Sequence, residues 1–438
     1  MSAFGQYRDL AFATADEIQS VQNRLLREQV AVCVRRSPYY RRTLGRADQL
    51  PSEITVDTLA ALPFTDKSHL EQFNDEFLAV PPERVADIVL SSGTTGQPTR
   101  IMYTARDLQR LAYNEELAFR ACGFTAQDVV LLTCTLDRCF VAGLAYFLGV
   151  RSVGAAAIRN GLNSLESHAA VIRQMRPTAI VGVPSFLRKL ALNLEQQGLN
   201  PRALGIARLM GIGEPVRGAD LELLALGEDL ERLWGAKVYS TYASSECVST
   251  FCECTAQQGG HQAPDLVVAE IVDDQGQRVS YGAVGELVLT PLGVEGMPLL
   301  RFRTGDVSYL IHEPCRCGRR SVRLGPILGR KAQMIKCRGT TFYPQALYSA
   351  LDEMPAVGEY FIEVRSPDRL SDEVTVRVAV REPSCTKALI QEKLQARVRV
   401  RPEVMIEPES KIRERVQTPK SRKPVRFVDL REQHDKLP

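Results

Sequence analysis

Short apolar segments alternate with helical patterns between residues 129 and 245, and this alternation limits the possible folds more than any other feature of the chain. The apolar segments, expected to be strands, lie at 129–132, 155–158, 179–183, 208–212 and 237–240. Helices are expected between them at 141–148, 164–175, 185–197 and after 212. Buried strands joined by helices form a parallel sheet covered on both faces, which binds ligands at the carboxyl ends of its strands. The chain is therefore expected to have an α/β fold.

The flanking residues predict two further regions. Residues 265–312 hold alternating and β-branched segments separated by turns, which is typical of antiparallel strands. After Gly329-Arg330 the order strand, helix, strand, strand, helix, strand predicts a small α+β domain. We therefore expect a large N-terminal domain at 1–328, with parallel and mixed sheets covered by helices plus a β region, and a mobile C-terminal domain at 329–438. The Lys- and Arg-rich segment from Lys411 indicates a mobile tail.

Composition excludes several classes of protein. The 438-residue chain is 45% apolar and 24% charged, as in an ordinary globular protein, and its net charge of +3 gives no basis for binding nucleic acid or an anionic membrane. No apolar run approaches the roughly 20 residues of a membrane helix, and residues 1–8 lack the pattern of a signal peptide. The eleven cysteines are therefore expected to be reduced thiols, some of them metal ligands, in a cytoplasmic protein.

A loop rich in hydroxyl groups and glycine follows the apolar run at 85–90. It reads Ser91-Ser92-Gly93-Thr94-Thr95-Gly96-Gln97-Pro98-Thr99. Glycine lets the backbone approach an anion closely, and hydroxyl groups add donors to the backbone N–H groups. The loop is not a Walker loop, because no Gly-Lys-Ser/Thr sequence follows and Gln97 occupies the place of a lysine. By itself it is either a polyphosphate-binding loop or a polar surface turn.

Later clusters carry further side chains that could bind a nucleotide or a metal ion. In Tyr242-Ala243-Ser244-Ser245-Glu246, the tyrosine can stack on a base and the carboxylate can hold Mg²⁺ on phosphates. Asp306, in Arg303-Thr304-Gly305-Asp306, suits a pair of ribose hydroxyl groups. Gly329-Arg330 marks the domain junction, and Lys423 lies near the C-terminus. Taken singly, each cluster also has an ordinary explanation as a helix start, a turn or a surface lysine.

The order of these motifs resembles the adenylate-forming superfamily of acyl-CoA synthetases and, more narrowly, the phenylacetate–CoA ligase family. The shared series is Ser-Ser-Gly-Thr-Thr-Gly, Tyr-x-x-Ser-Glu, Gly-Glu-Leu, Arg-Thr-Gly-Asp, Gly-Arg and a late lysine. Narrower similarities are Ser37-Pro38-Tyr39-Tyr40, Leu62-Pro63-Phe64-Thr65, Leu78-Ala79-Val80-Pro81, Phe342-Tyr343-Pro344 and Lys423 to Asp429. The resemblance covers nearly the whole chain.

The resemblance implies a binding site for ATP and AMP. The loop residues Ser91, Ser92, Gly93, Thr94, Thr95, Gly96 and Thr99 would hold the β- and γ-phosphates. Glu214 and Tyr242 would flank the adenine, with Ala243 and Ser244 in the same nucleotide site, and Asp306 would bind the ribose hydroxyl groups.

The same resemblance implies the catalytic residues. Ser245 would contact the α-phosphate, Glu246 would hold Mg²⁺, and Lys423, with Lys420 as the alternative, would stabilise the charge that develops at the α-phosphorus. Arg330 would reach the ribose or a phosphate. The small domain would swing about the Gly-Arg junction and bring Gly339 toward coenzyme A.

Three departures from the family pattern affect these roles. Ala332 occupies the hinge position where the family usually has an aspartate. Arg422, and not a glycine, precedes Lys423. In the segment that would form part of the acyl pocket, Asp137-Arg138-Cys139 replaces a tyrosine-glycine sequence before Phe140. These charges either line the pocket or cap the following helix.

Cysteines and a histidine form a separate pattern. Cys254 lies seven residues before His261, and Cys315-Arg316-Cys317 follows. Three thiolates and an imidazole suit a tetrahedral structural zinc, which some members of the resembled family hold between these segments. Cys252 or His312 could replace one ligand, and free cysteines in β turns are the alternative. Five other cysteines are expected to pack as small hydrophobic residues and not to bind a metal: Cys33, Cys122, Cys134, Cys337 and Cys385.

These expectations combine into one function and two alternatives. The chain is predicted to be an AMP-forming ligase that activates an aryl or other small carboxylic acid as an acyl-adenylate and then transfers the acyl group to coenzyme A. The first alternative is an adenylating enzyme with a different acceptor, and the second is a non-catalytic nucleotide-binding protein. The resemblance also implies a homodimer.

Overall fold

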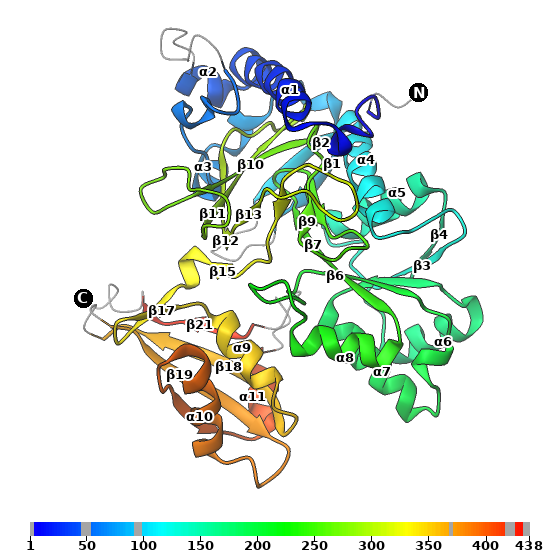
Figure 1. The fold of residues 1–438 in the computed structure, drawn as a ribbon, viewed down its shortest axis with the longest axis vertical. Coiled ribbons are helices and arrows are strands. Elements are labelled where there is room, and N and C mark those ends of the chain that lie inside the picture. Colours follow the sequence, from blue (N-terminus) through cyan, green and yellow to red (C-terminus); the bar gives the residue numbers. More distant parts are fainter. Residues whose placement is uncertain (1–3, 45–53, 92–98, 368–370, 417–424, 432–438) are drawn as a thin grey trace. The chain divides into compact units, whose positions relative to one another are not determined.

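The computed structural model describes residues 4–44, 54–91, 99–367, 371–416 and 425–431. The chain divides into two compact units, Met1–Ile327 and Leu328–Pro438 (Figure 1). Within the described residues, no helix combines the length and the apolar character that crossing a membrane requires.

A nine-stranded sheet forms the centre of the first unit. Its parallel part has the order β4 (Ala156–Arg159), β3 (Val129–Leu132), β5 (Ala179–Gly182), β6 (Arg208–Ile212) and β7 (Lys237–Ser244). Antiparallel strands continue the sheet in the order β8 (Ser249–Cys252), β9 (Gly260–His261), β14 (Arg323–Leu324) and β13 (Leu310–Ile311). The predicted α/β fold with a parallel sheet is confirmed.

Helices cover both faces of the parallel part, because successive side chains of each strand point to opposite faces. Val130 and Leu132 pack with α4 (Ala105–Ala121) and α5 (Val141–Val153). Leu131, between them, packs on the other face with α6 (Leu165–Met175), α7 (Pro184–Gln196) and α8 (Ala225–Trp234).

The rest of the first unit surrounds a second core. It holds the helices α1 (Ala15–Arg36), α2 (Pro38–Leu44) and α3 (Lys67–Gln72), the hairpin β1 (Val85–Leu90) and β2 (Arg100–Thr104), and the sheet β10 (Val267–Val272), β11 (Gly285–Pro291) and β12 (Phe302–Ser308). The β10–β11 and β11–β12 pairings are antiparallel, as expected. Short 3-10 helices lie at η1 (Leu10–Phe12), η3 (Leu59–Ala61), η4 (Asn74–Phe77), η5 (Pro82–Arg84) and η6 (Pro201–Ala203).

The second unit is a small α+β structure. It begins with β15 (Gly329–Arg330), the 3-10 helix η7 (Lys331–Gln333) and the hairpin β16 (Ile335–Cys337) and β17 (Thr340–Phe342). Its sheet has the order β20 (Glu403–Ile406), β19 (Glu373–Val380), β18 (Val357–Arg365) and β21 (Phe427–Asp429). Helices α9 (Pro344–Asp352) and α10 (Lys387–Val398) pack on one face, and α11 (Glu409–Val416) packs on the other.

The expectation of a mobile tail from Lys411 is wrong for the described part of that segment. Ile412 and Val416 of α11 are fully buried against Phe361 and Ala379. Strand β21 pairs in parallel with β18. The apolar residues lie on one face of a short helix, and the many basic residues around them masked this pattern in the sequence.

Candidate functional site

Two residues of the expected nucleotide site lie at one edge of the large sheet. Strands β6 and β7 are parallel neighbours, so their carboxyl ends lie at the same edge. Glu214 follows β6, and Tyr242 lies near the end of β7. The Glu214 carboxylate accepts hydrogen bonds from the backbone N–H and the hydroxyl group of Ser185, both at 2.9 Å, in the first turn of α7. Sequence reasoning missed Ser185, although its place after Pro184 at a helix start was a usable signal.

The loop that carries Glu214 is closed by a buried ion pair. Arg217 pairs with Glu253 and also donates to the Leu221 carbonyl oxygen at 3.1 Å. Glu253 in turn accepts a hydrogen bond from the Ser240 backbone N–H at 2.8 Å. Both side chains of the pair are buried, so these contacts hold the loop against β7.

Tyr242 and Asp306 are in direct contact. The Tyr242 hydroxyl donates to Asp306 Oδ2 at 2.8 Å. Burial, together with the neighbouring Asp306 carboxylate, raises the pKa of Tyr242 well above its usual value, so the phenol remains a proton donor. The Asp306 backbone N–H donates to the Thr304 hydroxyl at 3.1 Å, and this hydroxyl donates to the Leu287 carbonyl oxygen at 2.8 Å. The part of β12 that carries Asp306, which the sequence had placed at a turn, is therefore tied to β11.

The hydroxyl-rich loop leaves and re-enters the fold at adjacent points. The Ser91 backbone N–H donates to the Thr99 carbonyl oxygen at 2.9 Å, and the Thr99 N–H donates to Ser91 Oγ at 3.4 Å. Both residues are buried, and Thr99 Oγ1 has no hydrogen-bond partner among the described residues. The predicted phosphate-binding residues Ser92, Gly93, Thr94, Thr95 and Gly96 lie outside the described residues.

A tyrosine that the sequence did not single out links this loop to the Ser-Glu motif. Tyr103, on β2 immediately after the loop, donates through its hydroxyl to the Ser245 carbonyl oxygen at 2.7 Å. In the same motif, the Ser244 hydroxyl donates to Glu246 Oε2 at 3.2 Å. The structure thus joins β2, the strand that follows the loop, to the turn that holds Ser245 and Glu246.

The segment before α5 adopts an unusual backbone conformation. Arg138 and Cys139 both have positive φ angles, of 59° and 52°. The Leu90 backbone N–H donates to the Cys139 carbonyl oxygen at 2.7 Å, so this segment lies beside the start of the hydroxyl-rich loop. Phe140, and not Asp137, is the N-cap residue of α5, so the alternative in which these charges cap the helix is wrong.

The remaining predicted residues belong to the second unit or lie outside the described residues. Arg330 ends β15 and precedes η7. Gly339 and Arg338, both with positive φ angles, form the two-residue turn between β16 and β17, which is the conformation of a type I′ turn. Lys420 and Lys423 are not among the described residues.

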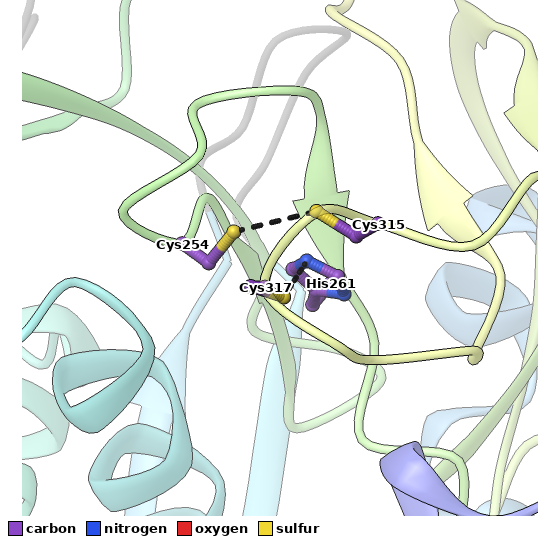
Figure 2. A group of neighbouring side chains, drawn as sticks. All are labelled: Cys254, His261, Cys315 and Cys317. Atoms are coloured by element: carbon purple, nitrogen blue, oxygen red, sulfur yellow. Dashed lines mark hydrogen bonds between the residues drawn. The ribbon is translucent and has the colours of Figure 1, made fainter.

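Three cysteines and one histidine converge in the first unit (Figure 2). The ligand atoms of Cys254, His261, Cys315 and Cys317 all lie within 4.8 Å of one another. Cys254 Sγ lies 3.6 Å from Cys315 Sγ, and Cys317 Sγ lies 3.5 Å from His261 Nε2. Cys254 follows β8, His261 ends β9, and the other two come from the turn between β13 and β14. Neighbouring strands of one sheet therefore bring the four ligands together.

Burial and two nearby arginines shift the pKa values of this cluster. Burial raises the pKa of Cys254 to about 12 and, with the charges of Arg319 and Arg323, lowers the pKa of His261 to about 3. The imidazole is therefore neutral and can offer a lone pair. Burial also raises the pKa of Cys317, but hydrogen bonds from the backbone and side chain of Arg319 outweigh it, and the net shift is downward. Backbone N–H groups add to this, since Ala256 donates to Cys254 Sγ at 3.4 Å.

The two alternative ligands do not belong to the cluster. The sulfur of Cys252 lies 3.3 Å from that of Cys122, and His312 stacks on Tyr281. The cysteines expected to pack as small hydrophobic residues are buried within hydrophobic cores, as predicted: Cys33, Cys122, Cys134, Cys337 and Cys385.

Comparison with known protein families matches both units. Residues 14–294 match the family model described as AMP-binding enzyme. Residues 339–431 match the model of the AMP-binding enzyme C-terminal domain. The first match alone spans more than half of the chain.

Individual relatives narrow the assignment. The chain is 34% identical to a phenylacetate-coenzyme A ligase of Thermus thermophilus over 375 residues, which are 84% of this chain and 82% of the relative. It is 30% identical to a phenylacetate-coenzyme A ligase of Escherichia coli over 381 residues, 85% of each chain. A crystal structure of 2-hydroxyisobutyryl-CoA ligase, in the postadenylation state, shares the fold with a TM-score of 0.84 and 23% identity, covering 98% of this chain and 92% of that one. The chain belongs to the phenylacetate–CoA ligase family of adenylate-forming enzymes and is an AMP-forming acid–CoA ligase.

Proposed function

We propose that this ligase activates a small aromatic carboxylic acid, with arylacetates such as phenylacetate as the first candidates. The relatives named phenylacetate-coenzyme A ligase support this class of substrate. The segment Asp137-Arg138-Cys139 differs from the family pattern, and its charges are compatible with an acid that carries a polar substituent on its ring. The observation that carries the adenylation chemistry is the convergence of Tyr242, Asp306 and the Ser245-Glu246 turn in one unit, and the class of acid rests on the named relatives.

The nucleotide is proposed to bind along this convergence. Tyr242 and Glu214 flank the adenine, and Ala243 and Ser244 complete this part of the site. Asp306, oriented by the Tyr242 hydroxyl, accepts hydrogen bonds from the ribose hydroxyl groups. The buried and unpartnered Thr99 Oγ1 supports a phosphate-binding role for the loop from Ser91 to Thr99.

The chemistry is proposed to depend on positioning and on cations. Ser245 contacts the α-phosphate, and Glu246 supplies a carboxylate oxygen of the kind that Mg²⁺ prefers. Lys423 stabilises the charge that develops as the acid's carboxylate attacks the α-phosphorus and pyrophosphate leaves. The second unit then reorients, with Arg330 at its start and Gly339 directed to coenzyme A, whose thiolate attacks the carbonyl carbon of the acyl-adenylate and displaces AMP.

The Cys254–His261–Cys315–Cys317 cluster is proposed to be a structural zinc site. Three thiolates and one imidazole are a usual ligand set for tetrahedral zinc. Since all four positions are filled by protein ligands, none is left for water or substrate, which favours a structural role over a catalytic one.

The acid is identified by ATP–pyrophosphate exchange. We expect exchange with at least one member of a panel of arylacetates, benzoates, hydroxylated aryl acids and short aliphatic acids, because each accepted acid allows reversible formation of the acyl-adenylate. Coenzyme A added to the same mixtures is expected to yield the corresponding thioester, measured by mass spectrometry.

The outcomes of this panel separate the alternatives. Exchange with several acids but no thioester would overturn the role of coenzyme A and favour another acceptor. Binding of ATP without exchange across the panel would favour the non-catalytic alternative. Exchange restricted to aliphatic acids would contradict the proposed substrate class alone.

Replacing Tyr242 by phenylalanine is expected to raise KM for ATP by about tenfold, because a hydrogen bond to a charged group contributes about 1.5–3 kcal/mol. The Asp306 carboxylate would lose the phenol that orients it, while the acid site stays intact. Tyr360→Phe is the matched control, since the Tyr360 hydroxyl donates to Asp352 at the same 2.8 Å in the second unit. Equal KM values for ATP in the two variants would contradict the proposal that the Tyr242–Asp306 pair binds the ribose.

A homodimer and a cytoplasmic location remain predictions. The oligomeric state is measured directly by light scattering coupled to size-exclusion chromatography. A monomer at micromolar concentration would contradict the dimer without affecting the proposed activity.

A further inference from the structure

Arg431, the last described residue of the chain, holds the segment that begins the second unit. Its guanidinium donates to the Ala332 carbonyl oxygen at 3.0 Å and to the Met334 carbonyl oxygen at 2.7 Å. The same group pairs with Asp429 at 2.5 Å and with Asp372 at 3.3 Å. One side chain therefore joins the end of β21 and the residue before β19 to the backbone of residues 332–334.

Asp372 extends this connection by two residues. Its carboxylate oxygen Oδ2 accepts a hydrogen bond from the Lys336 backbone N–H at 2.8 Å, in addition to the contact with Arg431. The Asp372 backbone N–H donates to the Lys336 carbonyl oxygen at 2.7 Å. Charge-assisted hydrogen bonds are stronger than neutral ones, and Arg431 can offer several because its donors are fixed in one plane. Residues 332–336 are thus fastened to the sheet at both ends.

This network bears on how the second unit moves. The hinge was expected at Ala332, but the carbonyl group of Ala332 is already bound to Arg431. A hinge residue must change its backbone angles freely, and a fastened carbonyl group opposes such a change. The contacts favour a rigid segment from Ala332 onward.

We infer that Arg431 is a positioning residue that makes residues 332–336 a rigid part of the second unit and moves the bend between the two half-reactions to positions before Ala332. This inference rests on the proposed function, because it assumes that the second unit reorients between adenylation and thioester formation. In this role Arg431 contacts none of the three substrates. It acts through the backbone of residues 332–336, which it holds in place.

The test compares Arg431→Ala with Arg377→Ala in the full-length enzyme. Arg377 is the matched control because it pairs with two carboxylates, those of Glu363 and Glu407, in the same sheet. Its side chain is 22% exposed and that of Arg431 is 20% exposed, but its pairs do not include residues 332–336. Arg431→Lys keeps the charge and loses the planar set of donors.

Hydrogen exchange monitored by mass spectrometry gives the first readout. In Arg431→Ala, the amides of residues 332–336 are expected to exchange about tenfold faster or more, which corresponds to the loss of one charge-assisted hydrogen bond. Arg377→Ala is expected to leave this peptide unchanged, and Arg431→Lys to lie between the two. Unchanged exchange in Arg431→Ala would overturn the inference, whether or not the enzyme forms a thioester.

Steady-state kinetics gives the second readout. In Arg431→Ala, kcat for thioester formation is expected to fall about 3- to 30-fold, the range found for residues that couple distant sites. KM for ATP and for the acid should change less than about twofold, because most of the residues proposed to bind ATP and the acid belong to the first unit. Equal effects of Arg431→Ala and Arg377→Ala on kcat would reduce Arg431 to a stabilising residue. If the wild-type enzyme forms no thioester at all, the proposed function fails, and the exchange measurement alone decides the inference.

Discussion

Lys423→Ala is expected to lower the rate of ATP–pyrophosphate exchange by about 10²- to 10³-fold, the usual loss when one group that stabilises transition-state charge is removed. In-line displacement at the α-phosphorus needs little covalent help from the protein, so a single well-placed cation contributes much of the rate. The loop from Ser91 to Thr99 contains no lysine or arginine, which makes a cation from elsewhere in the chain necessary. Thioester formation from supplied acyl-adenylate should remain close to the wild-type rate.

Lys420→Ala is the control for this prediction. Lys420 lies three residues before Lys423 in the same basic segment and is the alternative catalytic residue. If Lys420→Ala abolishes exchange and Lys423→Ala does not, the catalytic role passes to Lys420. An equal loss of both half-reactions in Lys423→Ala would contradict a role confined to adenylation.

Loss of the proposed zinc is expected to have the second large effect, on stability. Cys254→Ser should lower the free energy of unfolding by about 4 kcal/mol or more, because loss of a bound metal is one of the few single changes that reach this size. The cluster joins the segment after β8 to the segment between β13 and β14. Loss of the metal would therefore remove the connection between these two segments. Chemical denaturation and elemental analysis of the purified protein measure the two quantities.

Cys33→Ser controls for the burial of a new hydroxyl group. Both cysteines are fully buried in the first unit, but Cys33 packs among hydrophobic side chains. Cys33→Ser should keep about one equivalent of zinc and lose stability when a chelator is added, whereas Cys254→Ser should not respond to the chelator. Less than about 0.2 equivalents of zinc in the wild-type protein, with no other metal bound, would contradict the site.

The sequence predicted the elements of the fold because their signals are local. The continuous apolar segment that includes Val130, Leu131 and Leu132 is visible in the sequence, and such a segment is typical of a strand buried on both faces, as this one is. The same reasoning failed at α11, where Ile412 and Val416 are separated by one turn and surrounded by charged residues. Two apolar positions in a short helix are too few to establish a period.

Residue types at the site were also predictable, but their partners were not. The resemblance in motif order pointed to Tyr242, Glu246 and Asp306, whose roles at the nucleotide remain predictions. The contact of Tyr103 with Ser245 joins positions 142 residues apart, and that of Glu214 with Ser185 joins positions 29 residues apart. Neither pair has a spacing that a local pattern could reveal.

The cysteines show the same division between composition and geometry. Sequence indicated a set of three thiols and an imidazole but left Cys252 and His312 as possible members. Cys252 lies within β8 and directs its sulfur to Cys122, whereas Cys254 lies two residues further, beyond the end of the strand. Only the coordinates decided between them, because the two cysteines are two residues apart in the sequence and their sulfur atoms have different neighbours.

By itself, the sequence determined the strand and helix order, the two-layer burial of the parallel strands, the family and the chemical types needed for adenylation. These properties follow from hydrophobic periodicity and from residue chemistry, and both can be recognised in short stretches of the sequence. Only the tertiary structure decided that Tyr103 holds the Ser-Glu turn, that Cys254 completes the cysteine cluster, and that Arg431 fastens residues 332–334. Each of these contacts depends on how distant backbone segments meet, and that meeting is set by the packing of the whole unit.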